Sequence, residues 1–575
     1  MPTKTVAEII IDTLQAAGVK RVYGLVGDSL NGLTDTIRTR EGIEFIQVRH
    51  EEAGAFAAGA EAHVTGGLAV CAGSCGPGNT HLINGLFDCH RSRMPVLALA
   101  AQIPSIEIGT GYFQETHPER LFQECSHYCE VIATPEQAVR MVEGAIQASL
   151  GLGGVSVLVV PGDVLRLKAE APAPRLPVLG HSSCVVPAKT KIAEAAKLLN
   201  ACEKVTILAG IGCDSAHAEL LQAAQALQAP VVHALRGKEC IEANNPYDVG
   251  LTGLLGMPAG YHALMDADGV LMLGTDFPYR QFFPENARVV QVDKHVERIG
   301  RRTRVEVGLH GTIIETLALL LPQLRARTDS AHLEAAQQRH RDDDAHLAEL
   351  ATGEAGDTSL HPPHVARLLS ELATDNAIFT CDVGTPTIWA ARYLRMNGHR
   401  RLIGSFIHGS MAGALSQAIG IQLACPGRQV IAMCGDGGFT MLLSELLTVR
   451  QLKVPIKMVI FNNSAYGFVE LEMKAAGTLE YGTEMDNPDF SQLAEAAGIK
   501  GLRVSDPAQL ESVLREALAH DGPVLVDAVV KRQELSMPPH IELAQAQGFS
   551  LYALKAIMDG RGGELLDMAK TNLFR

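Results

Sequence analysis

The chain has 575 residues, which is too long for a single hydrophobic core and predicts three or four domains. Hydrophobic residues make up 47% of it and charged residues 20%, as in ordinary globular proteins. The formal net charge of −15 argues against a nucleic-acid partner and against a purely electrostatic attraction to anionic lipid.

The amino-terminal stretch is expected to form a helix. Thr5 and Glu8 have the spacing of a capping box before an amphipathic segment. The stretch lacks the pattern of a signal peptide, and no segment reaches the ~20 apolar residues of a membrane-spanning helix. The twelve cysteines include no paired CxxC set, so neither a disulfide framework nor a structural zinc site is expected. These features favour a cytoplasmic location.

Short apolar runs alternate with glycine-rich turns and helical segments along most of the chain. The runs are rich in Val, Ile and Leu without clean alternation, which is typical of strands buried on both faces. They span residues 68–73, 95–101, 155–160, 205–210, 270–274, 289–293, 378–381, 430–434, 456–461 and 524–530. Strands separated by helices predict parallel sheets of βαβ units, and therefore an α/β fold with doubly wound sheets.

Two breaks divide this rhythm. The first is rich in proline and precedes a helix near Lys191, and the second is the charged stretch 322–364. We therefore predict three α/β domains, followed by a fourth piece in which no further strand is expected. The predicted boundaries give domains at 1–182, 183–335 and 336–530, and a carboxy-terminal region at 531–575.

The most informative stretch spans residues 430–468. An apolar strand ends in GDGG at 435–438, a helix follows, and a second strand ends at Asn463. In a right-handed βαβ unit the two strands are parallel neighbours, so Asp436 and Asn463 should emerge together at their carboxyl ends. Carboxylate and amide oxygens suit Mg²⁺, and the glycines and the helix amino terminus suit a phosphate. The pattern predicts a magnesium–diphosphate anchor.

GDG alone is a weak signal, since it is also typical of a plain strand-to-helix turn. Its combination with NN, 27 positions from Asp436 to Asn463, is stronger. With this pair the chain resembles the thiamine-diphosphate-dependent enzymes, whose signature is GDG followed by NN after a helix and a strand. The resemblance implies thiamine diphosphate and Mg²⁺ as cofactors, with Asp436, Asn463 and Ala465 as metal ligands. It also implies cofactor contacts from Gly437, Gly438, Ser464, Tyr466, Gly467 and Phe468.

A glutamate that opens a helix of small residues, Glu51, matches a second requirement of that family. Taken alone, Glu51 is equally typical of a first-turn acid favoured by the helix dipole. The resemblance implies that it contacts the cofactor pyrimidine and favours its imino form. It further implies that the Gly409 carbonyl accepts from the pyrimidine amino group, that Ser410 contacts the cofactor, and that Met411 lies under its bend. A lone Met is more often core filler.

The family's two half-sites meet across a subunit interface. The resemblance therefore implies at least a dimer, and the family suggests a tetramer.

The whole chain is most similar to one subgroup, the bacterial flavin-dependent pyruvate dehydrogenases that donate electrons to ubiquinone. The stretches that carry this likeness include HEEAGAFAAGAEA, GYFQETHPERLF, FTCDVGTPTIWAARYL and GFSLYALKAIMDGRG. The resemblance implies oxidation of pyruvate to acetate and CO₂ via hydroxyethyl-thiamine diphosphate, with electrons passing through FAD to ubiquinone. It makes the three domains pyrimidine-binding, FAD-binding and diphosphate-binding. The implied substrate pocket comprises Phe113, Gln114, Val383, Phe468 and Glu472, although each position alone is most often a packing residue.

The central domain lacks a full GxGxxG pattern, so its residues alone do not identify a dinucleotide site. Asp293 ends a strand, where an acidic residue commonly accepts from a ribose hydroxyl. The resemblance implies FAD here; the alternative is an empty domain. The implied FAD contacts are Thr252, Gly253, Leu254, Leu255, Gly274, Thr275, Asp276, Phe277, Pro278, Tyr279 and Asp293. Gly311-Thr312 departs from the Gly-Asp frequent in relatives.

The last sixteen residues predict a short amphipathic helix. Leu565, Leu566, Ala569 and Leu573 share one arc at ~100° per residue. Such a helix can lie on a membrane surface but cannot span it, and it can equally close over the protein's own core. The resemblance implies that this tail binds lipid at the inner face of the cell membrane once the flavin is reduced.

Three alternatives remain open at the level of sequence. An oxygen-dependent pyruvate oxidase shares nearly every motif but has little use for an amphipathic tail. An acetolactate synthase binds FAD without using it for redox chemistry. A non-catalytic scaffold is disfavoured by the presence of Glu51, Asp436 and Asn463.

Overall fold

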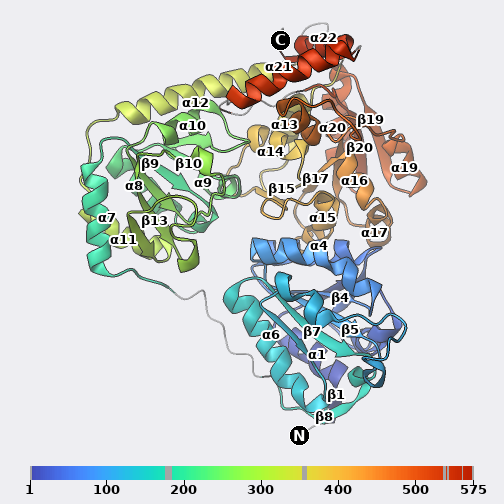
Figure 1. Cartoon of the computed structure of the whole chain (residues 1–575). Coiled ribbons are helices and arrows are strands. Elements are labelled where there is room, and N and C mark those ends of the chain that lie inside the picture. Colours follow the sequence, from blue (N-terminus) through green and yellow to red (C-terminus); the bar gives the residue numbers. More distant parts are fainter. Residues whose placement is uncertain are drawn as a thin grey trace.

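The computed structural model describes residues 3–174, 184–352, 359–534, 539, 543–559 and 561–572. The described residues form three six-stranded parallel sheets with helices packed against them (Figure 1). A small antiparallel ribbon of β1 (Thr3–Thr5) and β8 (Lys168–Glu170) is added to the first unit. The predicted α/β class with three parallel sheets is confirmed.

The amino-terminal sheet has the strand order β3-β2-β4-β5-β7-β6. Its strands are β2 (Arg21–Gly24), β3 (Glu44–Gln47), β4 (Ala69–Gly73), β5 (Val96–Gln102), β6 (Tyr128–Val131) and β7 (Val155–Pro161). Its helices are α1 (Val6–Ala16), α2 (Asn31–Arg38), α3 (Glu51–Thr65), α4 (Pro77–Ser92), α5 (Pro118–Leu121) and α6 (Ala138–Leu152). The predicted capping box is confirmed at α1, where the Glu8 amide donates to Thr5 Oγ1 at 3.1 Å and the Thr5 amide donates to the Glu8 carboxylate at 2.8 Å.

The central sheet has the order β11-β10-β9-β12-β13-β14. Its strands are β9 (Val205–Ala209), β10 (Val231–His233), β11 (Asp248–Leu251), β12 (Gly269–Leu273), β13 (Arg288–Asp293) and β14 (Val307–His310). Its helices are α7 (Lys189–Ala201), α8 (His217–Leu227), α9 (Lys238–Ile241), α10 (Pro258–Met265), α11 (Ile313–Leu320) and α12 (Ala331–Leu350). Numbered from β9, this is the 3-2-1-4-5-6 order of dinucleotide-binding folds.

The carboxy-terminal sheet has the order β16-β15-β17-β18-β20-β19. Its strands are β15 (Ile378–Cys381), β16 (Arg401–Gly404), β17 (Val430–Gly435), β18 (Lys457–Asn462), β19 (Lys500–Val504) and β20 (Val524–Val529). Its helices are α13 (Pro362–Leu372), α14 (Thr385–Tyr393), α15 (Gly413–Ala424), α16 (Asp436–Met441), α17 (Glu445–Leu452), α18 (Gly467–Ala475), α19 (Phe490–Ala496) and α20 (Pro507–Ala519). Two tail helices follow, α21 (Leu543–Met558) and α22 (Gly562–Asn572).

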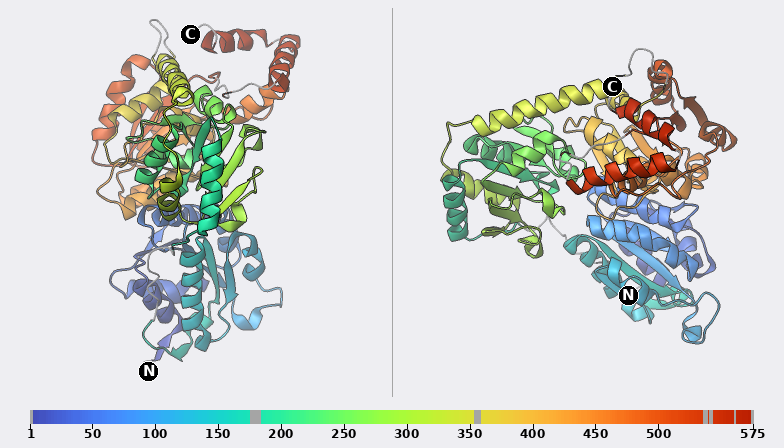
Figure 2. Two further views of the ribbon diagram at one scale, coloured as in Figure 1. Left: turned by 90° about the vertical axis from the view of Figure 1, so that its left-hand side faces the viewer. Right: turned by 45° about the horizontal axis from the view of Figure 1, so that its top comes forward.

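The three units meet through a few helices (Figures 1 and 2). Helix α3 of the first unit packs closely on α15 of the third, and α4 lies beside α3. Helix α12 packs on α10 of the central unit, so the predicted boundary at 335/336 falls inside a continuous helix. No helix in the described parts of the chain combines the length and apolar character needed to cross a bilayer.

Candidate cofactor and active site

The carboxyl ends of β17 and β18 bring the GDGG and NN motifs together. Asp436, 2% exposed, accepts hydrogen bonds from the Ser464 amide at 2.7 Å and from Asn487 Nδ2 at 2.8 Å. Asn463 Oδ1 accepts from the Ala465 amide at 3.2 Å. Burial raises the pKa of Asp436 to about 6. The carboxylate and the amide oxygen therefore flank one backbone segment, 463–465. The helix after GDGG is broken into α16 and α17 rather than continuous as expected.

The last two glycines of this motif leave no room for side chains. A Cβ at Gly437 would lie 2.5 Å from a ring atom of Tyr466, and one at Gly438 would lie 2.5 Å from a carboxylate oxygen of Asp382. Ser464 has a φ of +53°, an uncommon value for a residue with a side chain. A buried carboxylate, an amide oxygen and a helix amino terminus with close-packed glycines suit a hard cation and a diphosphate. The residues present fit the cofactor that the motif predicts.

Asp382 connects this turn to the first turn of α15, which directly follows the loop with Met411. Its carboxylate follows β15 and accepts hydrogen bonds from the Ala414 amide at 2.9 Å and the Gly435 amide at 3.2 Å. Asp382 is buried, and burial raises its pKa to about 7. The neighbouring strands β15 and β17 flank the switch point of the sheet, where ligands bind in doubly wound folds. Asp382 is not among the predicted site residues, although it directly precedes Val383.

The loop before α15 also contacts the amino-terminal unit. Ser410 Oγ accepts a hydrogen bond from Asn84 Nδ2 at 2.8 Å. Gly409 is exposed with a φ of +85°, and Met411 is half-buried. The three predicted contacts 409–411 therefore lie at the junction of the amino-terminal and carboxy-terminal units.

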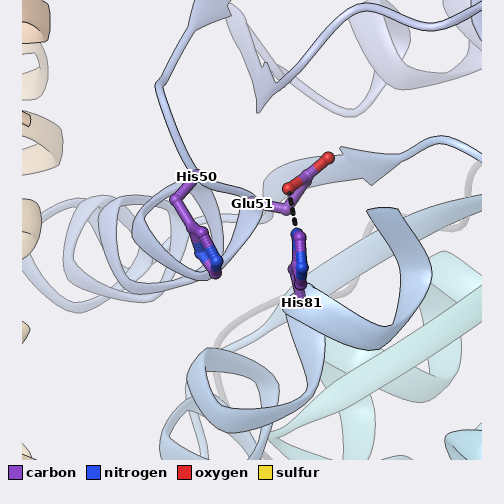
Figure 3. Close-up of side chains that lie close together, drawn as sticks. All are labelled: His50, Glu51 and His81. Carbon is purple, nitrogen blue, oxygen red and sulfur yellow. Dashed lines mark hydrogen bonds and ion pairs between the residues drawn. The ribbon is translucent and has the colours of Figure 1, made fainter. Parts of the chain in front are cut away.

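Glu51 is the first residue of α3 and is 4% exposed. Its Oε2 lies 2.9 Å from Nδ1 of His81, which is on α4 (Figure 3). The ring of His81 stacks on that of His50, with centroids 4.3 Å apart and an interplanar angle of 24°. His50 caps α3 by accepting from the Glu52 amide at 3.3 Å. The helix dipole favours the Glu51 carboxylate at this position, as the sequence indicated.

A carboxylate of the carboxy-terminal unit fixes the backbone before Glu51. Glu445, on α17 and fully buried, accepts from the amides of Arg49 and His50 at 3.0 Å each. Glu51 and Asp436 make no hydrogen bond or ion pair with each other within the described part of one chain. Each is built into its own half-site. Sequence reasoning missed His81 and Glu445, because both lie in helices without a distinctive local pattern.

The predicted substrate-pocket residues fall into two groups. Phe113, 79% exposed, and Gln114 lie on a loop of the amino-terminal unit, where Gln114 has a φ of +62°. Phe468 and Glu472 lie on α18, and Phe468 packs against the carboxy-terminal core while Glu472 is exposed. Val383 is half-buried beside Asp382. Their roles stay predictions.

The predicted flavin residues surround the switch point of the central sheet, between β9 and β12. A Cβ at Gly212 would lie 2.6 Å from Cα of Gly274, so the two turns touch. Thr252 Oγ1 is buried and has no hydrogen-bond partner within the described residues. Asp293 is buried, which raises its pKa, and it accepts from the His295 amide at 2.8 Å. The unsatisfied hydroxyl follows β11 and the strand-end acid closes β13, and each fits a polar group of a ligand such as a dinucleotide.

Two other predicted flavin residues are already engaged within the protein. The Asp276 carboxylate accepts from Arg302 Nε at 2.8 Å. Phe277 is buried, with its ring centroid 5.5 Å from that of Tyr279. A cofactor contact from Phe277 would therefore come from its backbone. Of the remaining predicted contacts, Leu254 and Tyr279 are exposed, whereas Gly253, Leu255 and Pro278 lie in the same loops.

Three family models match successive parts of the chain. They are described as the N-terminal TPP binding domain, the central domain and the C-terminal TPP binding domain of thiamine pyrophosphate enzymes, and they match residues 4–121, 192–320 and 382–528. The chain is 36% identical over 574 residues to YdaP of Bacillus subtilis, whose name provisionally describes it as thiamine pyrophosphate-containing; the match covers 99% of each chain.

Two relatives with named activities also match over most of their length. A pyruvate oxidase of Lactiplantibacillus plantarum is 31% identical over 535 residues, which are 91% of this chain and 88% of the relative. An acetolactate synthase of Mycobacterium bovis is 29% identical over 544 residues, which are 92% of this chain and 88% of the relative. The chain therefore belongs to the family of thiamine pyrophosphate enzymes.

Proposed function

We propose that this enzyme oxidises pyruvate and water to acetate, CO₂, two protons and two electrons, and that the electrons pass through FAD to ubiquinone. The proposal is supported by the 3-2-1-4-5-6 order of the central sheet and by the relative named pyruvate oxidase. The transfer of electrons to ubiquinone is supported by one observation, an exposed apolar face on α21. The working enzyme is at least a dimer, and a tetramer is the oligomer we propose.

When bound, thiamine diphosphate supplies the electron sink for loss of CO₂, and FAD supplies an acceptor for the two electrons. Asp436, Asn463 and the Ala465 carbonyl would hold Mg²⁺ against the diphosphate. Glu51 would accept a hydrogen bond from the pyrimidine and thereby favour its imino form, with Glu445 fixing the backbone that precedes it. Thr252 and Asp293 would bind polar groups of FAD. Glu472, exposed on α18, is available to orient water or to move a proton.

The apolar face of α21 supports a contact with lipid, where ubiquinone resides. Leu551, Leu554, Ile557 and Met558 are 45%, 61%, 62% and 88% exposed, respectively. Exposed apolar patches of this kind mark interaction sites. The predicted lipid-binding stripe lies instead on the last sixteen residues. Among the described leucines of α22, only Leu566 is largely exposed. Leu573 lies outside the described residues.

The tail is anchored on the helix that carries two predicted pocket residues. Tyr552 donates to the Glu480 carboxylate at 2.8 Å, and Lys474 Nζ lies 3.0 Å from the same oxygen. Arg561 lies 2.9 Å from the other Glu480 oxygen. Lys474 is on α18, together with Phe468 and Glu472. We propose a cytoplasmic enzyme whose tail binds the inner face of the cell membrane when the flavin is reduced. This binding would change the position of α18.

The test is pyruvate-dependent bleaching of the flavin band near ~450 nm in the anaerobic holoenzyme, followed by a soluble quinone. We expect pyruvate to bleach the band, quinone to restore it, and one acetate to form for each CO₂. Glu51→Gln is the control, since it should keep both cofactors and fail to bleach. A flavin that stays oxidised while pyruvate is consumed would overturn the proposal.

The named relatives suggest two other outcomes, which show when the experiment is repeated with O₂ in place of quinone and with analysis of the products. Re-oxidation by O₂ with peroxide release, faster than by quinone, would favour an oxygen-dependent pyruvate oxidase. Acetolactate formation without bleaching would favour an acetolactate synthase with non-redox FAD. Vesicles of anionic phospholipid provide a second readout, because quinone reduction should accelerate in their presence only if the tail binds lipid.

A further inference from the structure

A cluster of potential metal ligands surrounds Glu51. A nitrogen of His50, a carboxylate oxygen of Glu51 and a nitrogen of His81 all lie within 4.8 Å of one another. Glu51 and His81 come from two helices that pack side by side, α3 and α4, and His50 caps α3. Figure 3 shows His81 directed at the Glu51 carboxylate, with the His50 ring on the other side of His81's ring plane. His50 and His81 have no place in the proposed reaction. Their position around Glu51 therefore calls for a separate explanation.

The Glu51 carboxylate is buried with an imidazole as its partner rather than a lysine or an arginine. Its Oε2 lies 2.9 Å from His81 Nδ1, and the Glu51 side chain is 5% exposed. A buried carboxylate is stable only when hydrogen bonds or a cation compensate its charge. With thiamine diphosphate bound, the pyrimidine would provide that partner. In the cofactor-free protein, a divalent cation shared with the imidazoles would take that place.

The donor set suits a zinc-like cation rather than magnesium. Two imidazole nitrogens and a carboxylate oxygen form the three-ligand set of open zinc sites, in which water takes the fourth position. Bonds of ~2.0–2.1 Å in a tetrahedron place neighbouring donors about 3.3 Å apart, close to the 2.9 Å between Glu51 and His81. Magnesium prefers an all-oxygen shell and would not favour the two nitrogens.

The surroundings leave the histidines able to bind a metal. The two rings are nearly parallel, and modest rotations would bring one nitrogen of each beside the carboxylate. The His81 side chain is 44% exposed, so the cluster can be reached from solvent.

We propose that His50, Glu51 and His81 form a binding site for Zn²⁺ or a similar borderline transition metal in the cofactor-free enzyme. This metal and thiamine diphosphate would compete, because both need the Glu51 carboxylate. Zinc would thus block activation of the apoenzyme until the cofactor displaces it. The competition rests on the proposed role of Glu51, whereas the binding of the metal does not.

The binding test uses the full-length protein freed of thiamine diphosphate and Mg²⁺ and titrated with Zn²⁺ against a chromophoric chelator. We expect His81→Gln and His50→Asn to weaken the cluster-dependent Zn²⁺ binding at least tenfold. His50→Asn keeps an amino-terminal cap for α3, and His81→Gln keeps a polar partner for Glu51, so both variants should fold. Co²⁺ as a spectroscopic substitute should give a visible band of nitrogen and oxygen ligation that both variants lose.

The matched control is His127→Gln. His90 and His127 form a second pair of close rings, 4.4 Å apart, whose nitrogens contact the Val155 amide and the Gly153 carbonyl rather than a carboxylate. This control should bind Zn²⁺ and Co²⁺ like the unmodified protein. Equal Zn²⁺ affinity in the His50, His81 and His127 variants would overturn the proposed metal site.

The competition test adds thiamine diphosphate with Mg²⁺ to the zinc-loaded protein and measures Zn²⁺ release. We expect release in step with cofactor binding. Zinc that stays bound beside the cofactor would overturn the competition. Neither measurement uses pyruvate, flavin or quinone, so failure of the proposed reaction would leave these results unchanged and would be recognised separately.

Discussion

The amino-terminal and carboxy-terminal sheets have the same topology. Numbered within each sheet from β2 and from β15, both have the order 2-1-3-4-6-5. Strand 2 lies at the sheet edge in both, as β3 and β16, and leads to the helices α3 and α15, which pack on each other. Strand 3 ends in a glycine-containing turn in both, after β4 and after β17.

The chemistry differs at these equivalent places. In the first unit the acid is Glu51, at the start of the helix after strand 2, whereas the equivalent helix of the other unit follows Met411. In the carboxy-terminal unit the acid is Asp436, in the turn after strand 3, whereas the equivalent turn of the first unit is Gly73-Ser74-Cys75. Under the proposed function, one scaffold thus yields a half-site for the pyrimidine ring and a half-site for the diphosphate, and catalysis requires both.

The largest effects should separate these two half-sites. Glu51→Gln should reduce turnover roughly 10²–10⁴-fold, the usual range for a lost acid–base group, with cofactor affinity nearly unchanged. Asp436→Asn should instead weaken Mg²⁺-dependent cofactor binding by at least ~10–100-fold, because a metal ligand loses its charge. Calorimetric titration with thiamine diphosphate and a CO₂-release assay distinguish the two. Equal loss of affinity in both variants would contradict a division of labour between the half-sites.

The sequence predicted the centres of the sheets but missed their edges. The ten predicted apolar runs correspond to β4, β5, β7, β9, β12, β13, β15, β17, β18 and β20, none of which is at an edge. All six edge strands were missed, together with β2 and β10. An edge strand is partly exposed, so its apolar pattern is interrupted: Val307–His310, for example, alternates buried and exposed positions. A central strand covered by helices on both faces has a continuous apolar run.

The site was predictable where one short segment carries several ligands. Asp436 and Asn463 lie at the ends of consecutive strands, so βαβ geometry alone placed them together. Glu445 contacts the backbone of Arg49 and His50, which lie 396 and 395 positions earlier in the chain. Nothing in either segment indicates the other. Similarly, His81 meets Glu51 only because α3 and α4 pack side by side. Such contacts depend on tertiary structure and leave no local pattern.

The next effect tests the packing of the two equivalent helices. Gly420 on α15 faces the backbone of Ala57 on α3, and a Cβ at Gly420 would overlap the Ala57 carbonyl oxygen. Gly420→Ala should therefore destabilise the protein by about 1–3 kcal/mol or more, because neither backbone can move away freely. Thermal unfolding measures the change. Gly427→Ala, with open space around its Cβ, is the matched control and should unfold like the unmodified protein.

A smaller, pH-dependent effect comes from Asp88 at the same junction. Asp88 on α4 accepts from Gln417 Nε2 of α15 at 3.3 Å, and burial raises its pKa to about 6, above the ordinary value of an aspartate. A raised carboxyl pKa gives stability that is fully present below about pH 4 and is lost as the pH rises through about 6.

Asp88→Asn removes this charge at every pH. We expect the variant to gain stability relative to the unmodified protein above pH 7, by up to about 3 kcal/mol, and to lose the gain toward pH 4. Unfolding of both proteins followed across pH 4–8 measures the difference. The other buried carboxyls titrate in both proteins, so their contributions cancel in the difference in unfolding free energy. A difference that is constant with pH would contradict the assigned pKa.

The smallest expected effect concerns the tail, which has no counterpart in the amino-terminal unit. Ile557 and Leu554 are 62% and 61% exposed on α21, and burial of such a side chain in lipid is worth roughly 1.5–3 kcal/mol. Ile557→Glu should therefore weaken binding to vesicles of anionic phospholipid about tenfold or more, and Leu554→Glu similarly. Gln547→Glu adds the same charge to the exposed side of this helix without removing an apolar side chain. If all three variants lose vesicle binding equally, charge rather than apolar contact governs the tail, and α21 is not the lipid-binding face.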